Sequence, residues 1–153
     1  MSVGRLGSRA LSVLAALLLS SAALHAGPVA PIRVLLLGGL NTHEAQAALE
    51  PGQSTRLVKR ILEDTGRFAV DVTEDPSTLR PGTLASYAVV VDNWSNYPAP
   101  DCPWGEQAQR ALLAFARAGG GFVAIHASTA CFPAWPQYRD LIGIYWEEGK
   151  ANH

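Results

Sequence analysis

Short apolar runs along the chain predict four β-strands. Three of the runs are almost continuously apolar and end at glycine or at a polar residue. This is typical of strands that are buried on both faces of a parallel sheet. A fourth segment alternates apolar and polar residues, as a strand with one better-covered face does. The predicted strands are Ile32–Leu37, Phe68–Thr73, Tyr87–Val91 and Phe122–Ile125.

Apolar residues at helical spacing predict helices between and after these strands. The first two of these segments end next to a glycine, which commonly closes a helix, and the third has a proline in its first turn and a glycine after it. The predicted helices are Gln53–Thr65, Trp104–Ala118 and Trp135–Ile142. Alternating apolar strands and helices predict an α/β fold with a doubly wound, mainly parallel sheet. The arrangement is a three-layer one of the flavodoxin or Rossmann type.

The N-terminal residues predict export. Arg5 and Arg9 precede an apolar run, Ala10–Leu24, and small residues follow it. The run of about 15 residues is shorter than the roughly 20 that span a bilayer. We therefore predict a signal peptide over residues 1–26, with Ala23 as a second cleavage point, and a mature domain over 27–153 that is periplasmic or secreted. The alternative is that the apolar run is not cleaved and serves as a membrane anchor. If it is cleaved, the mature chain is expected to have no stable membrane span.

Charge argues against a nucleic-acid partner. The formal net charge is −1, and the chain has no basic cluster or stripe. Nucleic-acid-binding domains usually carry such a patch. A small molecule is therefore the expected partner, and the oligomeric state is left open.

Polar residues gather where the predicted strands end. Ligands of parallel α/β sheets bind beyond the carboxyl ends of the strands, so residues from three separate stretches are expected to share one site. These residues are Gly38, Gly39, His43 and Glu44 after the first strand, Asp92, Asn93 and Trp94 after the third, and His126, Ser128 and Thr129 after the fourth.

Four segments carry a resemblance to a known family. They are Leu35–Gly39 with the following His43 and Glu44, then Val89–Trp94, then Gly119–Ser128, and finally Phe132–Gly143 followed by Trp146 and His153. Together they resemble the ThuA-like family, named for trehalose utilisation, within the class I glutamine-amidotransferase-like superfamily. The resemblance implies a carbohydrate-linked role: the processing of a disaccharide or an oxidised sugar derivative. A non-catalytic carbohydrate-binding module and an inactive fragment are the alternatives, so whether the chain is an enzyme is left open.

The corner after Gly119–Gly121 is the expected centre of the site. In the superfamily a sharp turn here usually presents a nucleophilic cysteine, close to backbone N–H groups. This sequence has His126 instead, as ThuA-like proteins do, and Cys131 is not a replacement nucleophile. His126 is the expected acid/base, with His43 and Glu44 as further catalytic candidates. The alternative is a buried histidine whose nitrogens bind the backbone.

The remaining candidates are binding residues. Asp92 and Asn93 are expected to orient sugar hydroxyls, although both are also ordinary turn residues. Trp94 and Phe132 are expected to stack on a sugar, whereas core packing explains Trp104 and Trp135, at predicted helix starts, equally well. The predicted substrate-binding set is Gly39, Asp92, Asn93, Trp94, Ser128, Thr129 and Phe132.

A divalent metal and a disulfide are two further expectations. A catalytic zinc needs three protein ligands, which His43, His126 and His153 together would supply. Cys102 and Cys131 follow the third and fourth strands, and in an oxidising compartment they are predicted to form a disulfide.

The C-terminus is the last expectation. The family pattern continues for several strands beyond His153, so the sequence is predicted to be incomplete, with the C-terminal strands missing. An uncovered sheet edge would result. The alternative is a minimal domain that a partner chain completes.

Overall fold

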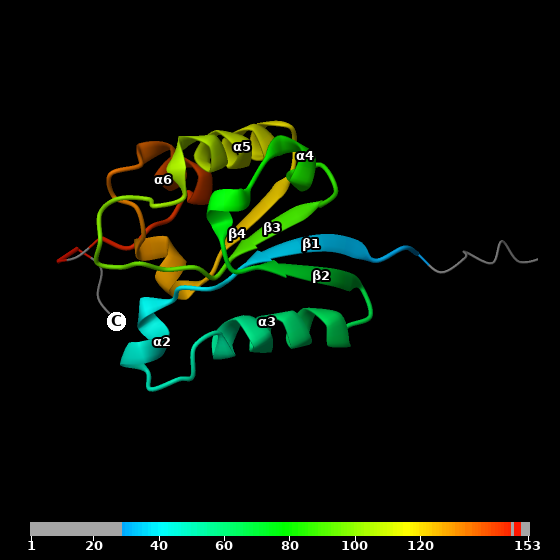
Figure 1. Cartoon of the computed structure of the whole chain (residues 1–153), viewed down its shortest axis with the longest axis horizontal. Coiled ribbons are helices and arrows are strands. Elements are labelled where there is room, and N and C mark those ends of the chain that lie inside the picture. The colour runs from blue at the N-terminus through cyan, green and yellow to red at the C-terminus, as the bar shows by residue number, and fades with distance from the viewer. Residues whose placement is uncertain (1–28, 148, 151–153) are drawn as a thin grey trace, which may run out of the picture. The chain divides into compact units, whose positions relative to one another are not determined.

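Four parallel strands form the sheet of the described part of the chain. The structure is a computed structural model that describes residues 29–147 and 149–150. The strands are β1 (Ile32–Leu37), β2 (Phe68–Thr73), β3 (Val89–Asp92) and β4 (Gly121–Ala124). Their order is β2-β1-β3-β4, and each neighbouring pair is parallel. The predicted parallel sheet is therefore confirmed (Figure 1).

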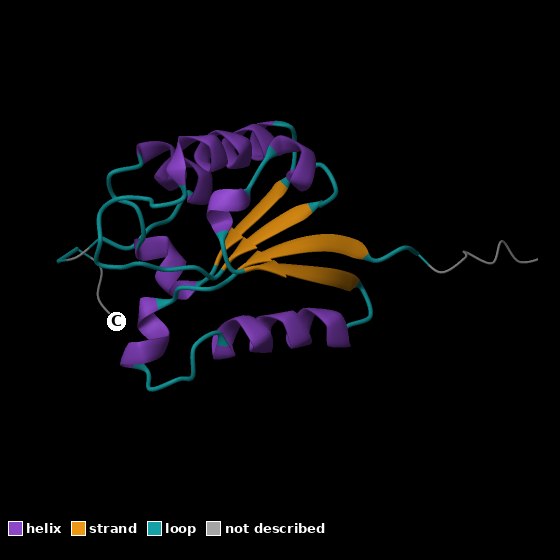
Figure 2. Cartoon of the chain, in the orientation of Figure 1, coloured by secondary structure: helices purple, strands orange, loops and turns teal. Residues whose placement is uncertain are grey.

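Helices cover both faces of this sheet (Figure 2). One face packs against α3, and the other packs against α4, α5 and α6. The predicted doubly wound, three-layer arrangement is thus confirmed. The helices are α2 (Thr42–Gln46), α3 (Gln53–Asp64), α4 (Pro81–Leu84), α5 (Gly105–Arg117) and α6 (Pro136–Ile142), with the short 3-10 helices η1 (Pro76–Thr78) and η2 (His126–Ala130).

The central strand β1 contributes to two separate cores. Val34 and Leu36 pack on the α3 side, in a cluster with side chains of α3. Leu35 and Leu37 point to the opposite face, into the larger cluster that includes α5 and α6. Successive side chains of a strand alternate between the two faces, so a strand covered on both needs an apolar residue at every position. This explains the apolar run Val34–Leu37, the buried part of β1.

Several short elements were not predicted. The helices predicted from the sequence do not include the segments that form α2 and α4. Both helices are only four or five residues long, so neither repeats an apolar position often enough to show helical periodicity. A local signal for α2 is present in Asn41, whose side chain accepts a hydrogen bond from the backbone N–H of His43, as helix-capping residues do.

Two expectations fall outside the described residues. The predicted signal peptide, residues 1–26, and His153 both lie there. Among the residues that the structure does describe, no helix combines the length and the apolar character that a membrane crossing needs.

Candidate functional site

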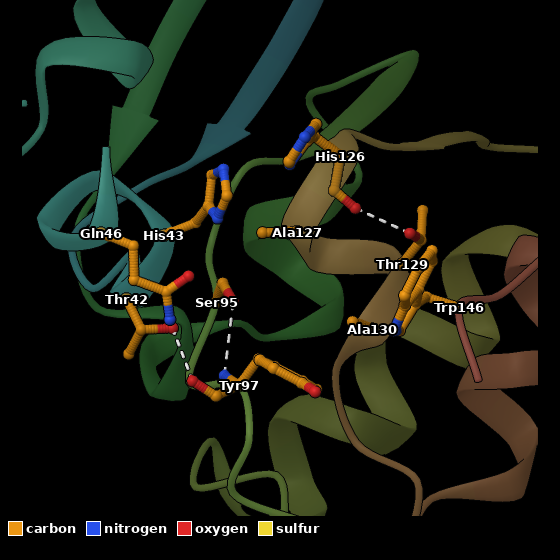
Figure 3. Close-up of a pocket in the computed structure, with 10 residues that line it drawn as sticks. All are labelled: Thr42, His43, Gln46, Ser95, Tyr97, His126, Ala127, Thr129, Ala130 and Trp146. Carbon is orange, nitrogen blue, oxygen red and sulfur yellow. Dashed lines mark hydrogen bonds between the residues drawn. The ribbon is translucent and has the colours of Figure 1, made fainter. Parts of the chain in front are cut away.

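A cavity of about 350 Å³ opens at the carboxyl edge of the sheet. Its walls come from the segments that follow β1, β3 and β4, as the strand-end rule predicts. Figure 3 shows side chains of α2 on one side and side chains of η2 with Trp146 on the other. The lining residues are Thr42, His43, Gln46, Ser95, Tyr97, His126, Ala127, Thr129, Ala130 and Trp146.

Two histidines that are far apart in the sequence meet at this cavity. The ring centroids of His43 and His126 lie 4.5 Å apart, and the ring planes are inclined by 39°. Both residues are exposed and both line the cavity. Two imidazoles in this position are able to accept and donate protons to a bound molecule. They are the strongest chemical feature of the cavity.

His126 sits in a strained backbone conformation. It begins η2 directly after β4, and its φ of 49° lies in the left-handed region that side chains rarely adopt. The hydroxyl of Thr129 donates a 2.7 Å hydrogen bond to the carbonyl of His126, which closes the turn. Strain of this kind is concentrated at functional sites, where it aims a side chain. The sharp corner that the sequence predicts at His126 is therefore present.

His43 is held in place by the α2 helix. The backbone N–H of Thr42 donates to the carbonyl of Ser95 at 3.0 Å, and the hydroxyl of Thr42 donates to the carbonyl of Tyr97 at 2.8 Å. Both contacts join the start of α2 to the segment after β3. The wall that carries His43 is thus attached to the segment after β3, which also lines the cavity.

Glu44 faces away from the cavity and caps the neighbouring helix. Its carboxylate accepts hydrogen bonds from the backbone N–H groups of Gly52 (2.7 Å) and Ser54 (2.8 Å) at the start of α3. Burial alone would raise the pKa of Glu44, but these bonds and the Ser54 hydroxyl outweigh it and hold the pKa below its usual range. An anion at a helix N-terminus is favourable. The position of Glu44 therefore indicates a structural role as a helix cap, in addition to the catalytic role that was predicted from the sequence.

Replacing Glu44 by alanine is expected to lower the free energy of unfolding by about 1–3 kcal/mol, because two helix N–H groups lose their acceptor. Urea denaturation at neutral pH measures this loss. Glu50→Ala, at an exposed position between α2 and α3, is the matched control and should change little. Equal stability of the two variants would contradict the capping role.

Asp92 lies in the core beneath the cavity. The residue is 0% exposed. One carboxyl oxygen accepts from the Tyr138 hydroxyl at 2.6 Å, and the other accepts from the Trp94 N–H at 2.9 Å. Burial raises the pKa of Asp92 to about 7, against the lowering effect of these two hydrogen bonds. A group buried at this depth is in no position to orient a sugar hydroxyl in the cavity directly.

Asn93 and Gly39, two further predicted binding residues, also have roles in holding the fold together. The Asn93 amide donates to the hydroxyls of Ser54 (2.8 Å) and Thr55 (3.0 Å), which ties β3 to α3. Gly39 has φ of 93°, and a Cβ atom added to it would lie 2.2 Å from the carbonyl oxygen of Glu74. Glycine is required there by the backbone itself.

Two predicted residues on η2 point in different directions. Ser128 is 0% exposed, and its hydroxyl lies 2.9 Å from the carbonyl oxygen of Asp92 and 3.0 Å from that of Trp94. Thr129 lines the cavity. Ser128 therefore joins η2 to the end of β3, while Thr129 is available to a ligand.

Trp94 and Phe132 belong to the core. Trp94 is 5% exposed and Phe132 is 0% exposed. Their ring centroids lie 5.6 Å apart, and both rings contact Trp104. Aromatic side chains in such a cluster stabilise the fold by burial. Their ring faces are therefore occupied by core packing, and the sugar-stacking role predicted for them has no room here.

The predicted disulfide is absent from the structure, where Cys102 and Cys131 are free thiols. The sulfur of Cys131 lies 3.3 Å from the Ser95 hydroxyl and is buried in the larger core. Burial raises the pKa of Cys102 to about 11 and also raises the pKa of Cys131. The two loops do lie together, since the N–H of Ala134 donates to the carbonyl of Pro100 at 3.1 Å, but the Cys131 sulfur is directed at Ser95.

Two of the three predicted metal ligands, His43 and His126, lie together in the structure. Their side by side rings would supply two imidazole ligands. No group of three or more His, Cys, Asp or Glu residues suited to a metal occurs among residues 29–147 and 149–150. A catalytic zinc requires three protein ligands, and the predicted third one, His153, lies outside those ranges.

Some lining residues were not predicted. They come from α2, from the loop after β3 and from the segment after α6. The side chains that were not predicted and that are able to contact a ligand are Thr42, Gln46, Ser95, Tyr97 and Trp146. The rule on strand ends already pointed to the loop that carries Ser95 and Tyr97. Trp146 stands in a segment that matched the family pattern, which was the available signal for it.

Comparisons with known proteins agree with this architecture. The family model described as ThuA, trehalose utilisation, matches residues 33–153. A crystal structure of a putative ThuA-like protein from Bacteroides uniformis ATCC 8492 is similar in fold, with a TM-score of 0.52 and 22% identity. The match covers 73% of this chain and 44% of that one, so this chain spans less than half the length of its structural relative. No curated protein matches the sequence.

Proposed function

Because this chain belongs to the ThuA family, whose description is trehalose utilisation, we propose that it is an exported enzyme acting on a disaccharide or an oxidised sugar derivative. The family supports a carbohydrate-related role in general terms. The finer part of the proposal is that the reaction takes place in the cavity at the carboxyl edge of the sheet.

The pair of His43 and His126 carries this proposal. Their rings are 4.5 Å apart at the wall of the cavity. Histidine is the side chain whose ordinary pKa suits proton transfer near neutral pH. We assign His126 as the acid/base that moves a proton on or off a sugar oxygen. His43, beside it, is placed to exchange that proton or to orient the sugar.

Polar groups around the pair suit a ligand rich in hydroxyls. Thr42 and Gln46 lie on the His43 side, and Thr129 lies on the His126 side (Figure 3). Hydroxyl and amide side chains both donate and accept hydrogen bonds. A sugar ring therefore finds partners on both sides of the cavity.

Incubation with trehalose, other disaccharides and their oxidised derivatives tests the proposal, with sugars followed by NMR and with zinc present or chelated in parallel. His126→Ala is expected to lower turnover by roughly 100-fold or more, as loss of a general acid/base does. The melting temperature should stay near that of the wild type, because His126 is an exposed side chain.

Gln107→Ala, at an exposed position on α5, is the matched control and should keep full turnover. Undiminished turnover by His126→Ala would remove His126 from the mechanism. Recovery of every sugar unchanged by the wild type, together with heat of binding, would instead support the alternative of a carbohydrate-binding module.

Export is part of the same proposal. It is supported by the two arginines and the apolar run Ala10–Leu24 at the N-terminus, a pattern typical of signal peptides. N-terminal sequencing of the protein purified from its native host is expected to begin at Gly27, and a start at Met1 would contradict export by this route.

A further inference from the structure

We propose that Trp146 is a sugar-stacking residue of the cavity and that it selects ligands with a closed pyranose ring. The inference rests on the proposed sugar-binding function of this cavity and names the residue that recognises the ring. The aromatic residues singled out in the sequence, Trp94 and Phe132, are buried in the core, so the stacking partner has to be found elsewhere.

Trp146 lies opposite the polar wall of the cavity. Figure 3 shows it beside Thr129 and Ala130, across from Thr42 and His43. The residue lines the cavity and is only partly buried. A ligand between the two walls would thus meet an indole on one side and imidazole, hydroxyl and amide groups on the other.

Two contacts hold the segment that carries Trp146 in place. The guanidinium of Arg139 lies 4.1 Å from the ring centroid of Tyr145. The backbone N–H of Trp146 donates to the carbonyl of Thr129 at 3.0 Å. The first contact joins the segment after α6 to α6 itself, and the second joins it to η2, the element that also carries His126. The indole and the proposed acid/base are therefore positioned by the same short helix.

This asymmetry matches the chemistry of a pyranose. The ring presents C–H groups on its faces and hydroxyl groups around its rim. An indole favours the apolar face by burial and dispersion, as aromatic rings do, while Gln46 and Thr42 are placed to bind the rim. An open-chain polyol has the same hydroxyls but no fixed C–H face. It would consequently gain little from Trp146.

The size of the cavity limits what it holds. About 350 Å³ is at the lower end of the roughly 300–1,000 Å³ of small-molecule sites. We infer that the cavity takes one sugar ring and that the second ring of a disaccharide extends outside it. Stacking on Trp146 then orients that single ring toward His126.

Calorimetric titration with methyl α-glucopyranoside and with sorbitol tests the inference without requiring turnover. The wild type is expected to bind the pyranoside about tenfold more tightly than the polyol, which corresponds to one aromatic stacking contact. Trp146→Ala should lose that preference, and Trp146→Phe should restore part of it. Ile144→Ala, two positions earlier in the chain, exposed and outside the cavity lining, should keep the preference.

The outcomes separate this inference from the proposed function. Equal pyranoside affinity of Trp146→Ala and wild type would overturn the inference, even if the wild type processes sugars. Pyranoside binding that depends on Trp146, without any turnover, would support the inference and overturn the catalytic proposal. A wild type that binds neither probe would overturn the inference, while the catalytic proposal is decided by turnover of the disaccharides and oxidised derivatives. A melt of each variant checks that the fold is intact.

Discussion

Gly39→Ala is expected to lower the free energy of unfolding by about 4 kcal/mol or more, at the severe end of single substitutions. Two effects add. The φ of 93° at Gly39 disfavours any side chain, and the new Cβ would stand 2.2 Å from the carbonyl oxygen of Glu74. That oxygen belongs to the backbone, so no side-chain rotation relieves the overlap. Urea denaturation and the yield of folded protein measure the effect.

Two other glycines separate these effects. Gly119 has a similar φ of 95°, but an added Cβ would meet nothing within 4 Å. Gly119→Ala therefore reports the cost of the backbone conformation alone, roughly 1–3 kcal/mol. Gly82, on α4, also has open space and should tolerate alanine. If Gly39→Ala is no worse than Gly119→Ala, the close approach to Glu74 does not matter.

The result bears on how Gly39 was singled out. The sequence pattern suggested a substrate-binding glycine after β1. The structure explains the need for glycine differently. Gly39 lies in the chain between β1 and α2, the helix that carries His43, and its backbone closely approaches Glu74 just after β2. A loss of sugar binding in Gly39→Ala would then follow from a displaced α2 and would need no direct contact with the ligand.

The second large effect is a dependence of stability on pH that Asp92 causes. The pKa of buried Asp92 is raised to about 7, whereas an unfolded aspartate titrates near about 3.9. Between these values the folded chain binds the proton and the unfolded chain does not. Stability is therefore expected to fall as the pH rises from about 4 to about 7, by an amount on the order of 4 kcal/mol.

Burial is the reason that Asp92 retains a proton, and the hydrogen bonds around the carboxyl can accommodate that proton. The hydroxyl of Tyr138 lies 2.6 Å from an Asp92 oxygen and 3.1 Å from the carbonyl oxygen of Ser128. A phenol has one proton, so these two acceptors compete for it. If Asp92 is protonated, it donates to the Tyr138 oxygen and leaves the phenol proton to Ser128. The bond that the carboxylate accepts from Tyr138 lowers the pKa of Asp92, but burial raises it by more.

Asp92→Asn is expected to remove most of this pH dependence, because the amide is neutral throughout. Thermal melts at intervals from pH 4 to pH 8 compare it with the wild type. Asp101→Asn, at an exposed loop position, is the control and should follow the wild-type curve. Parallel curves for Asp92→Asn and wild type would show that Asp92 titrates normally.

Other carboxylates act in a different pH range. Hydrogen bonds from Ser54 and Gly52 overcome the burial that would raise the pKa of Glu44, and the Arg33 guanidinium lowers the pKa of Asp71. Groups with a lowered pKa add stability that is present above their ordinary pKa and is lost on acidification below it. The stability that Glu44 and Asp71 add is therefore lost only when the pH drops below about 4.5. This pH range is largely separate from the range of about 4 to 7 in which Asp92 acts.

The strands and long helices could be predicted because burial on a parallel sheet requires long apolar patterns. Ile32–Leu37 is apolar at nearly every position since β1 is central and covered on both faces. The five residues of α2 carry no such pattern. Apart from the capping residue Asn41, their helix depends on contacts with the segment after β3, which no local reading of the sequence reveals.

The candidate site could be located but not resolved into single roles. Convergence of strand ends was enough to place the segments of His43 and His126 at one edge. Whether a side chain there points outward or into the core depends on turn dihedral angles. His126 and Thr129 face the cavity, while Ser128, which lies between them on η2, is fully buried.

The attachment of Glu44 to α3 has a mechanical consequence for the cavity. One wall, with His43, is fixed through Glu44 to the layer beneath the sheet. The other wall, with Trp146, is fixed through η2 to Tyr138 in the layer above it. The width of the cavity therefore depends on the distance between the two helix layers that cover the sheet. Repacking either core would open or narrow the gap that a ligand enters, without touching a single residue that lines it.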